Sequence, residues 1–370
     1  MASAARIQAR LDAALARGGE AEVWIRFPRL LGDVLFVLPF LHALQADWNA
    51  RAAEAGARLR WVALGRRSGA SLFAEADPAF ISELRLDEVA GKLEPLALAR
   101  RWRRGPRPVA VLTLAQSARL ATAAWLGGVP LRAGVADNGL RPLYHAAVPY
   151  RGLQDHLAAR LGGLSRALGV PAPFHRTLGP DLLGGRSVFA TLAAAGWDGQ
   201  TSLVALAPGT RAEGKRWHPE LPHWPDLAER LAAAGLTPVV LGLEEETPLA
   251  KAIQTRVPGA LDLTGRTSLP EAAALLHRAG AAVAVDTGLA HLAAATGCAT
   301  VTLFGPSHEW FAQPIGPWSQ GLRGPGTALD PSDARSAGPH QEPSLIRLAP
   351  ERVARVLLAL REERASVLGA

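Results

Sequence analysis

The sequence predicts an α/β protein of two domains, each built on a parallel sheet with helices on both faces. The chain has 370 residues, which is enough for two domains with full cores. Short apolar runs suited to buried strands alternate with helical segments, first between residues 23 and 115 and again between 203 and 305. Strands that alternate with helices of ten or more residues favour parallel sheets, and two such sheets in one chain form a cleft between domains.

The first series has four apolar runs that we interpret as strands. They are Val23 to Phe27, Leu59 to Leu64, Ile81 to Leu86 and Val109 to Ala115. A helix is expected from about Asp33 to Trp48, because apolar residues recur there every three to four positions. This helix covers the predicted sheet.

A region rich in Gly, Pro and His, from Arg132 to Gly185, separates the two series and is interpreted as an acceptor-side loop region followed by the domain connection. The second series has strands at 203–209, 238–243 and 261–265, with helices near 224–234, 248–256 and 269–279, and it ends with a strand, turn, helix and strand over 282–305. We therefore predict an N-terminal domain over 1–185, a C-terminal domain over 186–349, and a last helix within 350–370.

The composition limits the kinds of site that the chain can build. Cys298 is the only cysteine, so one chain can form neither a disulfide nor a thiolate cluster, and we expect this residue to be buried. The histidines show no metal-ligand spacing, so no metal site is predicted. No apolar run is long enough to span a membrane, and the N-terminus lacks the apolar segment of a secretion signal. We expect a cytoplasmic protein.

The net charge of +7 fits a partner that carries phosphates or carboxylates. Arginines are concentrated at 100–104, which reads RRWRR, and Arg107 follows. This patch suits nucleic acid, an anionic membrane surface, or simply a solvated helix end. No recognised nucleic-acid-binding module accompanies it, so we predict no nucleic-acid partner.

The stretch AVAVDTGLAHLAAATGCATVTLFG, residues 282–305, reads as strand, turn, helix and strand. Its turn, Asp286, Thr287 and Gly288, lies where open sheets bind ligands and where helix N–H groups are unpaired. A phosphate fits there. Thr287 and His291 are four apart and share a helix face, while Asp286 and Thr287 are also suited to capping the helix.

Two further loops follow strands of the second series. Thr210, Arg211 and Lys215 in APGTRAEGKRWHPE bring a hydroxyl and positive charge to accessible amides, which suits a diphosphate, although a basic surface loop is the alternative. Glu244 suits either ribose hydroxyls or a solvated helix start. The loop is not a Walker motif, and no GxGxxG follows the first strand.

Asp33 in PRLLGDVL follows the first predicted strand and begins the first predicted helix. It suits a helix N-cap, or a carboxylate that takes a proton from an attacking hydroxyl at the rim of the cleft.

Together these segments resemble glycosyltransferase family 9, the bacterial lipopolysaccharide heptosyltransferases. The resemblance is carried, in order, by IRFPRLLGDVLFVLPFLHAL, APGTRAEGKRWHPE, LDLTGRTSLPEAAALL and VDTGLAHLAAATGCATVTLFGPS. It implies the GT-B fold, two Rossmann-like domains that face a central cleft, with the last helix crossing back to the N-terminal domain. It also implies inverting transfer of heptose from ADP-L-glycero-β-D-manno-heptose to a hydroxyl of the lipopolysaccharide inner core.

The resemblance also implies roles for individual residues. Asp33 resembles the general base of the family, and Lys215 the cation that offsets charge on the leaving ADP. The remaining donor contacts that it implies are Thr210 and Arg211 beside the diphosphate, Glu244 at the ribose, Thr267 at the adenine, and Asp286, Thr287, Gly288 and His291 at the phosphates and sugar. It implies no metal and no cofactor besides the nucleotide-sugar donor.

Two departures from the family pattern leave the acceptor open. The last strand is followed by GPSHE instead of the usual GPTDP, and the charged acceptor loops are not matched. Arg132, Arg141 and the arginines near Arg101 are candidates for an anionic lipopolysaccharide or another glycan. The alternatives are transfer of another sugar to a different acceptor, or a sugar-nucleotide-binding protein without catalysis. A peripheral contact with the cytoplasmic face of the inner membrane is compatible with each.

Overall fold

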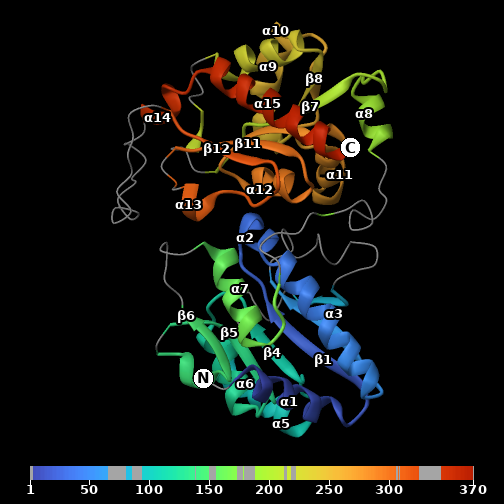
Figure 1. Cartoon of the computed structure of the whole chain (residues 1–370), viewed down its shortest axis with the longest axis vertical. Coiled ribbons are helices and arrows are strands. Elements are labelled where there is room, and N and C mark those ends of the chain that lie inside the picture. Colours follow the sequence, from blue (N-terminus) through green and yellow to red (C-terminus); the bar gives the residue numbers. More distant parts are fainter. Residues whose placement is uncertain are drawn as a thin grey trace. The chain divides into compact units, whose positions relative to one another are not determined.

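The computed structural model describes residues 3–65, 81–85, 94–137, 139–149, 156–172, 178, 188–211, 215–217, 222–305, 307, 309–324 and 343–369. The chain divides into two compact units, Met1–Arg176 and Thr177–Ala370. Each unit contains one sheet with helices packed on it (Figure 1). The predicted domain limits at 185 and 349 stay predictions, as does the crossing of the last helix to the first domain.

The first unit has a six-stranded sheet in the order β3-β2-β1-β4-β5-β6. All its strand pairs are parallel. The strands are β1 (Gly19–Arg26), β2 (Ala57–Leu64), β3 (Glu83–Arg85), β4 (Ala110–Thr113), β5 (Leu131–Ala136) and β6 (Ala146–Pro149). The described helices are α1 (Ala4–Leu15), α2 (Leu31–Leu35), α3 (Leu38–Glu54), α5 (Pro95–Arg104), α6 (Ala118–Leu126), η1 (Arg141–Leu143) and α7 (Leu157–Ala167).

The second unit has a six-stranded sheet in the order β12-β11-β10-β7-β8-β9, again parallel throughout. The strands are β7 (Ser202–Ala207), β8 (Leu236–Val240), β9 (Leu261–Asp262), β10 (Ala281–Val285), β11 (Ala299–Leu303) and β12 (Ser319–Leu322). The described helices are α8 (Phe189–Ala194), α9 (His223–Ala233), η5 (Glu244–Glu246), α10 (Thr247–Arg256), α11 (Leu269–Ala279), α12 (Gly288–Ala295), α13 (Glu309–Ala312), α14 (Pro343–Ile346) and α15 (Pro350–Leu368).

Both sheets have the same topology. Numbered from the first strand of its own unit, each sheet has the order 3-2-1-4-5-6. The first and fourth strands, β1 with β4 and β7 with β10, are therefore neighbours at the point where the chain reverses direction across the sheet. Ligands of doubly wound sheets bind at the carboxyl ends of the strands at this point. The fold class predicted from the sequence is confirmed.

One helix differs from its prediction. The helix expected from Asp33 to Trp48 is two helices, α2 and α3, which are separated by Phe36 and Val37. Pro39 in the first turn of α3 has no N–H to donate to Leu35, and its ring clashes with that carbonyl in a continuous helix. The break shortens the element that carries Asp33 to a single turn.

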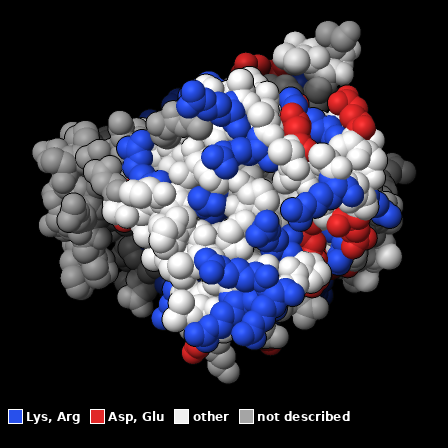
Figure 2. All heavy atoms as spheres, turned by 90° about the horizontal axis from the view of Figure 1, so that it is seen from below, with Lys and Arg blue, Asp and Glu red and all other residues white. Residues whose placement is uncertain are grey.

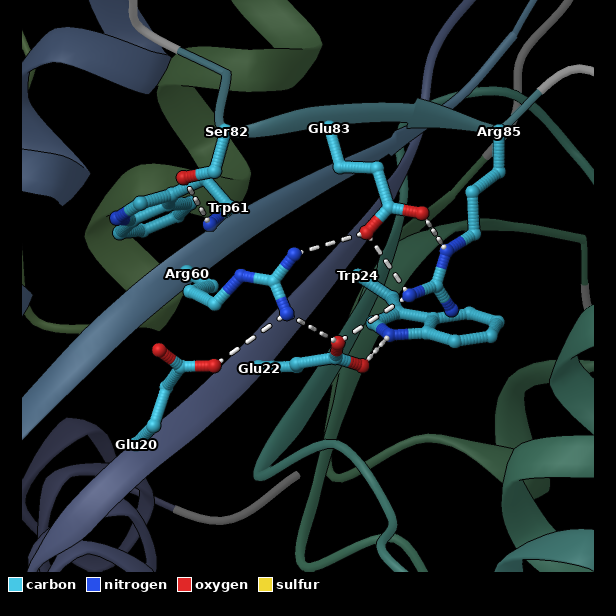
Figure 3. Close-up of polar contacts among 8 residues, drawn as sticks. All are labelled: Glu20, Glu22, Trp24, Arg60, Trp61, Ser82, Glu83 and Arg85. Carbon is cyan, nitrogen blue, oxygen red and sulfur yellow. Dashed lines mark hydrogen bonds and ion pairs between the residues drawn. The ribbon is translucent and has the colours of Figure 1, made fainter.

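The first strand also begins earlier than its apolar residues predict. Glu20 and Glu22 belong to β1, opposite Arg58 and Arg60 of β2. The Nη1 atom of Arg60 lies 3.3 Å from Glu20 Oε1 and 3.4 Å from Glu22 Oε1 (Figure 3). This half of the strand is therefore held by charge pairs across the sheet and not by apolar burial.

The cores of the units follow from their apolar residues. In the first unit, Trp24 of β1 meets Trp102 of α5 edge to face, with ring centroids 5.1 Å apart. In the second, the largest described cluster joins strand residues such as Val283 and Val301 to α9, α10 and α15. Val353 and Leu357 place the inner face of α15 in this cluster, where the helix contacts α9, β10 and β11. In each unit the core packs helices onto the sheet, and the loops at the strand ends lie outside this core, where they are available to form binding sites.

Candidate functional site

An ion pair joins the loops that follow β7 and β10 in the second unit. The Nζ atom of Lys215 lies 2.5 Å from Oδ2 of Asp286. The side chain of Asp286 is 5% exposed and that of Lys215 is 30% exposed. A carboxylate this buried requires a partner, because an unpaired buried charge is strongly destabilising. The pair therefore bridges the reversal point of the sheet and has one solvent-accessible side, that of the lysine.

Lys215 owes its position to a tryptophan two residues later. The side chain of Trp217 is 1% exposed. Its ring packs edge-on against Trp224 of α9 at 5.1 Å and lies 5.0 Å from the ring of His223. Lys215 and Trp217 flank Arg216, which is exposed. The buried indole thus anchors the segment that presents the lysine.

The turn between β10 and α12 leaves helix amides available. Thr287 is the N-cap residue by backbone geometry, but its hydroxyl makes no capping bond. The first helical hydrogen bond is donated by the N–H of Ala290 to the carbonyl of Thr287. The amides of Gly288 and Leu289 precede it in the first turn of the helix. Small side chains at Ala207 and Ala284 pack with Ala290, so the first turn of α12 lies close to the sheet. Such a helix start favours an anion.

His291 belongs to the same helix, one turn after Thr287, and is 8% exposed. It is thus nearly buried, beside the turn that carries Asp286. The structure brings Asp286, Thr287, Gly288, His291 and Lys215 together at this end of β10.

Two acids approach the same edge from the loop after β8. Glu244 is exposed, and its Cβ lies 3.3 Å from where a side chain on Gly265 would begin. Glu246 is partly buried, and its Oε2 accepts a hydrogen bond from the amide of Leu243 at 2.7 Å. A Cβ on Gly209, in the loop after β7, would lie only 2.4 Å from Oε1 of Glu246. The carboxylate beside the predicted diphosphate loop is therefore that of Glu246, which the sequence reasoning passed over.

The other predicted donor residues occupy neighbouring loops. Thr210 and Arg211 follow Gly209, with the first partly buried and the second exposed. Thr267 is partly buried immediately before Ser268, the residue that caps α11. All of these loops follow carboxyl ends of strands in the second sheet. Gly209 was the available signal for Glu246, because a glycine after a strand marks a close approach.

Asp33 lies at the corresponding edge of the first sheet. It is partly buried in the first turn of α2, after the carboxyl end of β1. The N-cap residue of α2 is Leu30, so the alternative in which Asp33 caps the helix is wrong. Asp33 is instead the third residue of α2, a single helical turn that Pro39 prevents from continuing into α3.

Arg26, the last residue of β1, is a further charged group at this edge that the sequence reasoning missed. Its Nε is buried and makes no hydrogen bond to any residue that the structure describes. Burial lowers the pKa of Arg26 below its ordinary value, and repulsion from Arg29 lowers it further. The two arginines favour an anion at the carboxyl end of β1.

The arginines considered for an acceptor lie at the opposite edge of the first sheet. Arg101 is in the last turn of α5, which ends shortly before β4 begins. Arg132 donates to the carbonyls of Val129 and Leu143, at 2.7 Å each, and Arg141 lies in η1 before β6. Because the strands are parallel, these positions share the amino-terminal edge. The structure does not bring them to Asp33.

No group of three His, Cys, Asp or Glu side chains in the described ranges is placed to hold a metal ion. None of the helices that the structure describes combines the length and apolar character needed to cross a bilayer.

The chain is similar in sequence to known heptosyltransferases. Residues 185–332 match the model of glycosyltransferase family 9 (heptosyltransferase). Lipooligosaccharide heptosyltransferase 2 of Haemophilus influenzae is 31% identical over 123 residues, which are 32% of this chain and 35% of that protein. Lipopolysaccharide heptosyltransferase 2 of Escherichia coli is 31% identical over 165 residues, 43% of this chain and 46% of that protein. The chain thus spans about a third to a half of the length of these curated relatives.

Solved structures extend the likeness over both units. E. coli ADP-heptose lps heptosyltransferase II superposes with a TM-score of 0.69 at 20% identity, covering 92% of this chain and 99% of that one. E. coli heptosyltransferase WaaC with ADP-2-deoxy-2-fluoro heptose superposes with a TM-score of 0.64 at 20% identity, covering 91% and 99%. These likenesses establish the fold, which is GT-B. Part of the chain, residues 185–332, is thus similar in sequence to glycosyltransferase family 9, the heptosyltransferase family.

Proposed function

We propose that the protein is an inverting glycosyltransferase that moves heptose from ADP-L-glycero-β-D-manno-heptose to a hydroxyl of the lipopolysaccharide inner core. The observation that carries this proposal is the ion pair between Lys215 and Asp286 at the reversal point of the second sheet. A cation, a nearly buried carboxylate and open helix amides at one strand end suit a diphosphate joined to a polyhydroxylated sugar.

Donor binding redistributes the contacts of this pair. Lys215 donates to the diphosphate, with the amide of Gly288 and the hydroxyls of Thr210 and Thr287 as further donors. Asp286 then accepts bonds from sugar hydroxyls, which replace part of its interaction with Lys215. Binding thus exchanges one charge-assisted contact for several, and the buried carboxylate stays paired throughout.

The nucleoside occupies the loops after β8 and β9. Glu246 is better placed than Glu244 to accept bonds from the ribose hydroxyls, because its carboxylate lies against Gly209. Thr267 lies beside the adenine. Arg211 is exposed and adds positive potential to the approach of the donor, and His291 lies beneath the diphosphate.

Transfer requires a base on the acceptor side. Asp33 takes the proton of the acceptor hydroxyl as its oxygen forms a bond to the anomeric carbon. The bond from that carbon to the β-phosphate oxygen breaks on the opposite face, so the configuration inverts and ADP leaves with the electron pair. Lys215 stabilises the charge that develops on ADP, which is the part of the barrier that electrostatic positioning lowers most.

Arg26 and Arg29 suit an acceptor that carries acidic sugars or phosphates, since both lie near Asp33 in sequence and at the end of β1. An inner-core lipopolysaccharide precursor has this character. The same proposal places the protein at the cytoplasmic face of the inner membrane, where a lipid-anchored acceptor is available.

The test is turnover by the purified protein with ADP-heptose and with UDP- and GDP-sugars, each offered together with inner-core acceptors. We expect transfer from ADP-heptose at least a hundredfold faster than from the other donors. Transfer from a different nucleotide sugar would replace the heptose assignment. Binding of ADP-heptose without transfer to any core acceptor would favour a sugar-nucleotide-binding protein.

A further inference from the structure

A second concentration of positive charge lies at the amino-terminal edge of the first sheet. There a hollow of about 670 Å³ is lined by the end of α1, the start of β1 and the loop that joins α5 to β4. Four arginines line it, Arg10, Arg17, Arg103 and Arg107. Seen from below, this end of the first unit carries a broad group of Lys and Arg side chains, with few Asp and Glu among them (Figure 2).

The acids that line the hollow are already engaged. Glu20 and Glu22 are the acidic lining residues, and both are paired with Arg60 (Figure 3). Glu22 also lies 3.2 Å from the Nη2 atom of Arg85 and accepts a hydrogen bond from the indole of Trp24 at 2.7 Å. These carboxylates are therefore saturated by groups on the sheet and offer little compensation to the arginines of the hollow.

Three of the four arginines have no protein partner among the residues that the structure describes. Arg10, Arg17 and Arg107 are exposed and make no hydrogen bond or ion pair with any residue in the described part of the chain. Arg103 is different, because its Nε donates to the carbonyl of Leu126 at the end of α6. The negative end of a helix therefore explains the position of Arg103, but it does not explain the other three arginines.

Repulsion from these cations also lowers the pKa values of neighbouring groups. The charge of Arg10 contributes to a lowered pKa of Arg132, after the larger effect of burial. It contributes also to the pKa of His145, which burial and Arg132 bring down to about 4. Unpaired like charges of this kind raise the potential of the hollow and favour a bound anion.

The surroundings indicate which anion fits. Trp102 is the aromatic residue in the lining of the hollow, and it is 2% exposed, so its ring is not available to stack on a base. Pro106, Pro108 and Pro130 stiffen the wall. Guanidinium groups on separate elements are suited to several phosphate oxygens at once.

We infer that this hollow binds a ligand that carries at least two phosphate groups, held by Arg10, Arg17 and Arg107. The site goes beyond the proposed function, since it lies at the ends of the strands opposite to that of Asp33. The same chemistry is found in soluble sugar phosphates and polyphosphates and in the headgroups of anionic lipids.

The test compares two probes, pyrophosphate in solution and vesicles of phosphatidylcholine with or without phosphatidylglycerol. The full chain is compared with R10Q/R17Q/R107Q and with K251Q/R347Q/R355Q, which removes three exposed cations of the second unit. All three chains also carry Lys215→Ala, so that the proposed donor site contributes little to pyrophosphate binding. Affinity is measured by calorimetry for pyrophosphate and by co-sedimentation for vesicles, at low ionic strength.

We expect the hollow variant to lose roughly tenfold in affinity for each arginine removed, because each loses a charge-assisted hydrogen bond. The control variant should remain within about twofold. Hydrogen exchange in the full chain should slow over residues 103–109 when the probe binds. If the full chain binds pyrophosphate and the hollow variant binds it more weakly, the ligand is a soluble phosphate compound. If only vesicles with phosphatidylglycerol bind, the ligand is a lipid headgroup.

Equal affinities of the hollow variant and the full chain for both probes would overturn the inference, as would a full chain that binds neither. If the triple variant fails to fold, Arg17→Gln alone serves, because Arg17 is exposed beyond the end of α1. It should weaken binding roughly tenfold. Activity with ADP-heptose is a separate measurement, so failure of one proposal leaves the other intact.

Discussion

The two units repeat one topology but differ in what they place at its reversal point. In the second sheet, Lys215 after β7 and Asp286 after β10 are joined 2.5 Å apart. In the first sheet, the loop after β1 carries Asp33 on a one-turn helix, with Arg26 at the strand end. In the proposed function the second arrangement exchanges the partner of a buried carboxylate for the donor, and the first supplies the base. One repeated fold thus has a proposed binding half and a proposed reactive half.

The largest expected effect tests the reactive half. Replacing Asp33 with Asn should lower kcat for heptose transfer by about 10³, because the amide accepts no proton from the acceptor hydroxyl. Affinity for ADP, measured by calorimetry, should not change. Asp12→Asn is the control, since Asp12 pairs with Arg51 on the outer helices, 3.3 Å away. Turnover within tenfold of the unaltered chain would remove Asp33 as the base.

The next effect tests the binding half. Lys215→Ala should weaken ADP binding by about 10- to 100-fold, because a charge-assisted bond is lost and the Asp286 carboxylate then faces the diphosphate. Adding Asp286→Asn should recover part of the affinity for ADP, since it removes that carboxylate charge. Calorimetry measures both. Lys251→Ala, an exposed lysine of α10, is the control. If ADP binds equally well without Lys215, the contrast between the two units loses its basis.

A smaller effect separates the two acids of the loop after β8. Glu246→Ala should weaken ADP binding roughly tenfold, as expected for the loss of hydrogen bonds to a charged group. Glu244→Ala is the matched control and should alter affinity less than twofold, because Glu244 is exposed beside Gly265. The reverse ranking would return the ribose contact to Glu244 and would show that Glu246 only supports the amide of Leu243.

The smallest effect concerns the first sheet itself. Burial, Arg132 and Arg10 lower the pKa of His145 to about 4 from an ordinary 6.5. The unfolded chain therefore binds a proton that the folded chain does not, and stability falls as the pH drops from about 6.5 to about 4. His145 is half-buried, so solvent screens part of this effect, and we expect the free energy of unfolding to fall by about 1 kcal/mol.

Urea unfolding at pH 7 and at pH 4 measures this loss, with His145→Asn as the reference. Asparagine retains an acceptor for the amide of Arg132, which His145 Nδ1 now accepts at 3.2 Å. The variant should lose less stability between the two pH values than the unaltered chain. Equal losses would indicate that other groups of the first unit carry the pH dependence.

Much of the fold was predictable because apolar runs report buried strands directly. Val23 to Ile25 and Ala281 to Val285 are buried on both faces and were recognised as strands. Glu20 and Glu22 were missed, because cross-strand charge pairs have no apolar signature. The break before α3 was missed because the apolar spacing continues through Phe36 and Val37, and only the steric effect of Pro39 interrupts it.

The site was predictable to a similar degree. His291 lies on α12 and Thr287 is the N-cap residue of that helix, and this relation follows from their spacing of four residues. Which of Glu244 and Glu246 approaches the loop after β7 depends on the directions that the short 3₁₀ helix η5 gives to their side chains. The spacing of residues in the sequence does not determine these directions. The contact between Lys215 and Asp286 joins residues 71 positions apart, so it emerges only when the sheet is assembled.

The thiol of Cys298 has a practical consequence for the study of domain motion. It is fully buried before β11, and burial raises its pKa to about 12. At pH 7.5 its thiolate fraction is far below one in a thousand, so maleimide dyes should leave it unmodified. Since the chain has no other cysteine, engineered surface cysteines, one in each unit, would accept a donor and an acceptor fluorophore without any background substitution. Energy transfer between the dyes would then report whether the distance between the units changes when ADP-heptose is added.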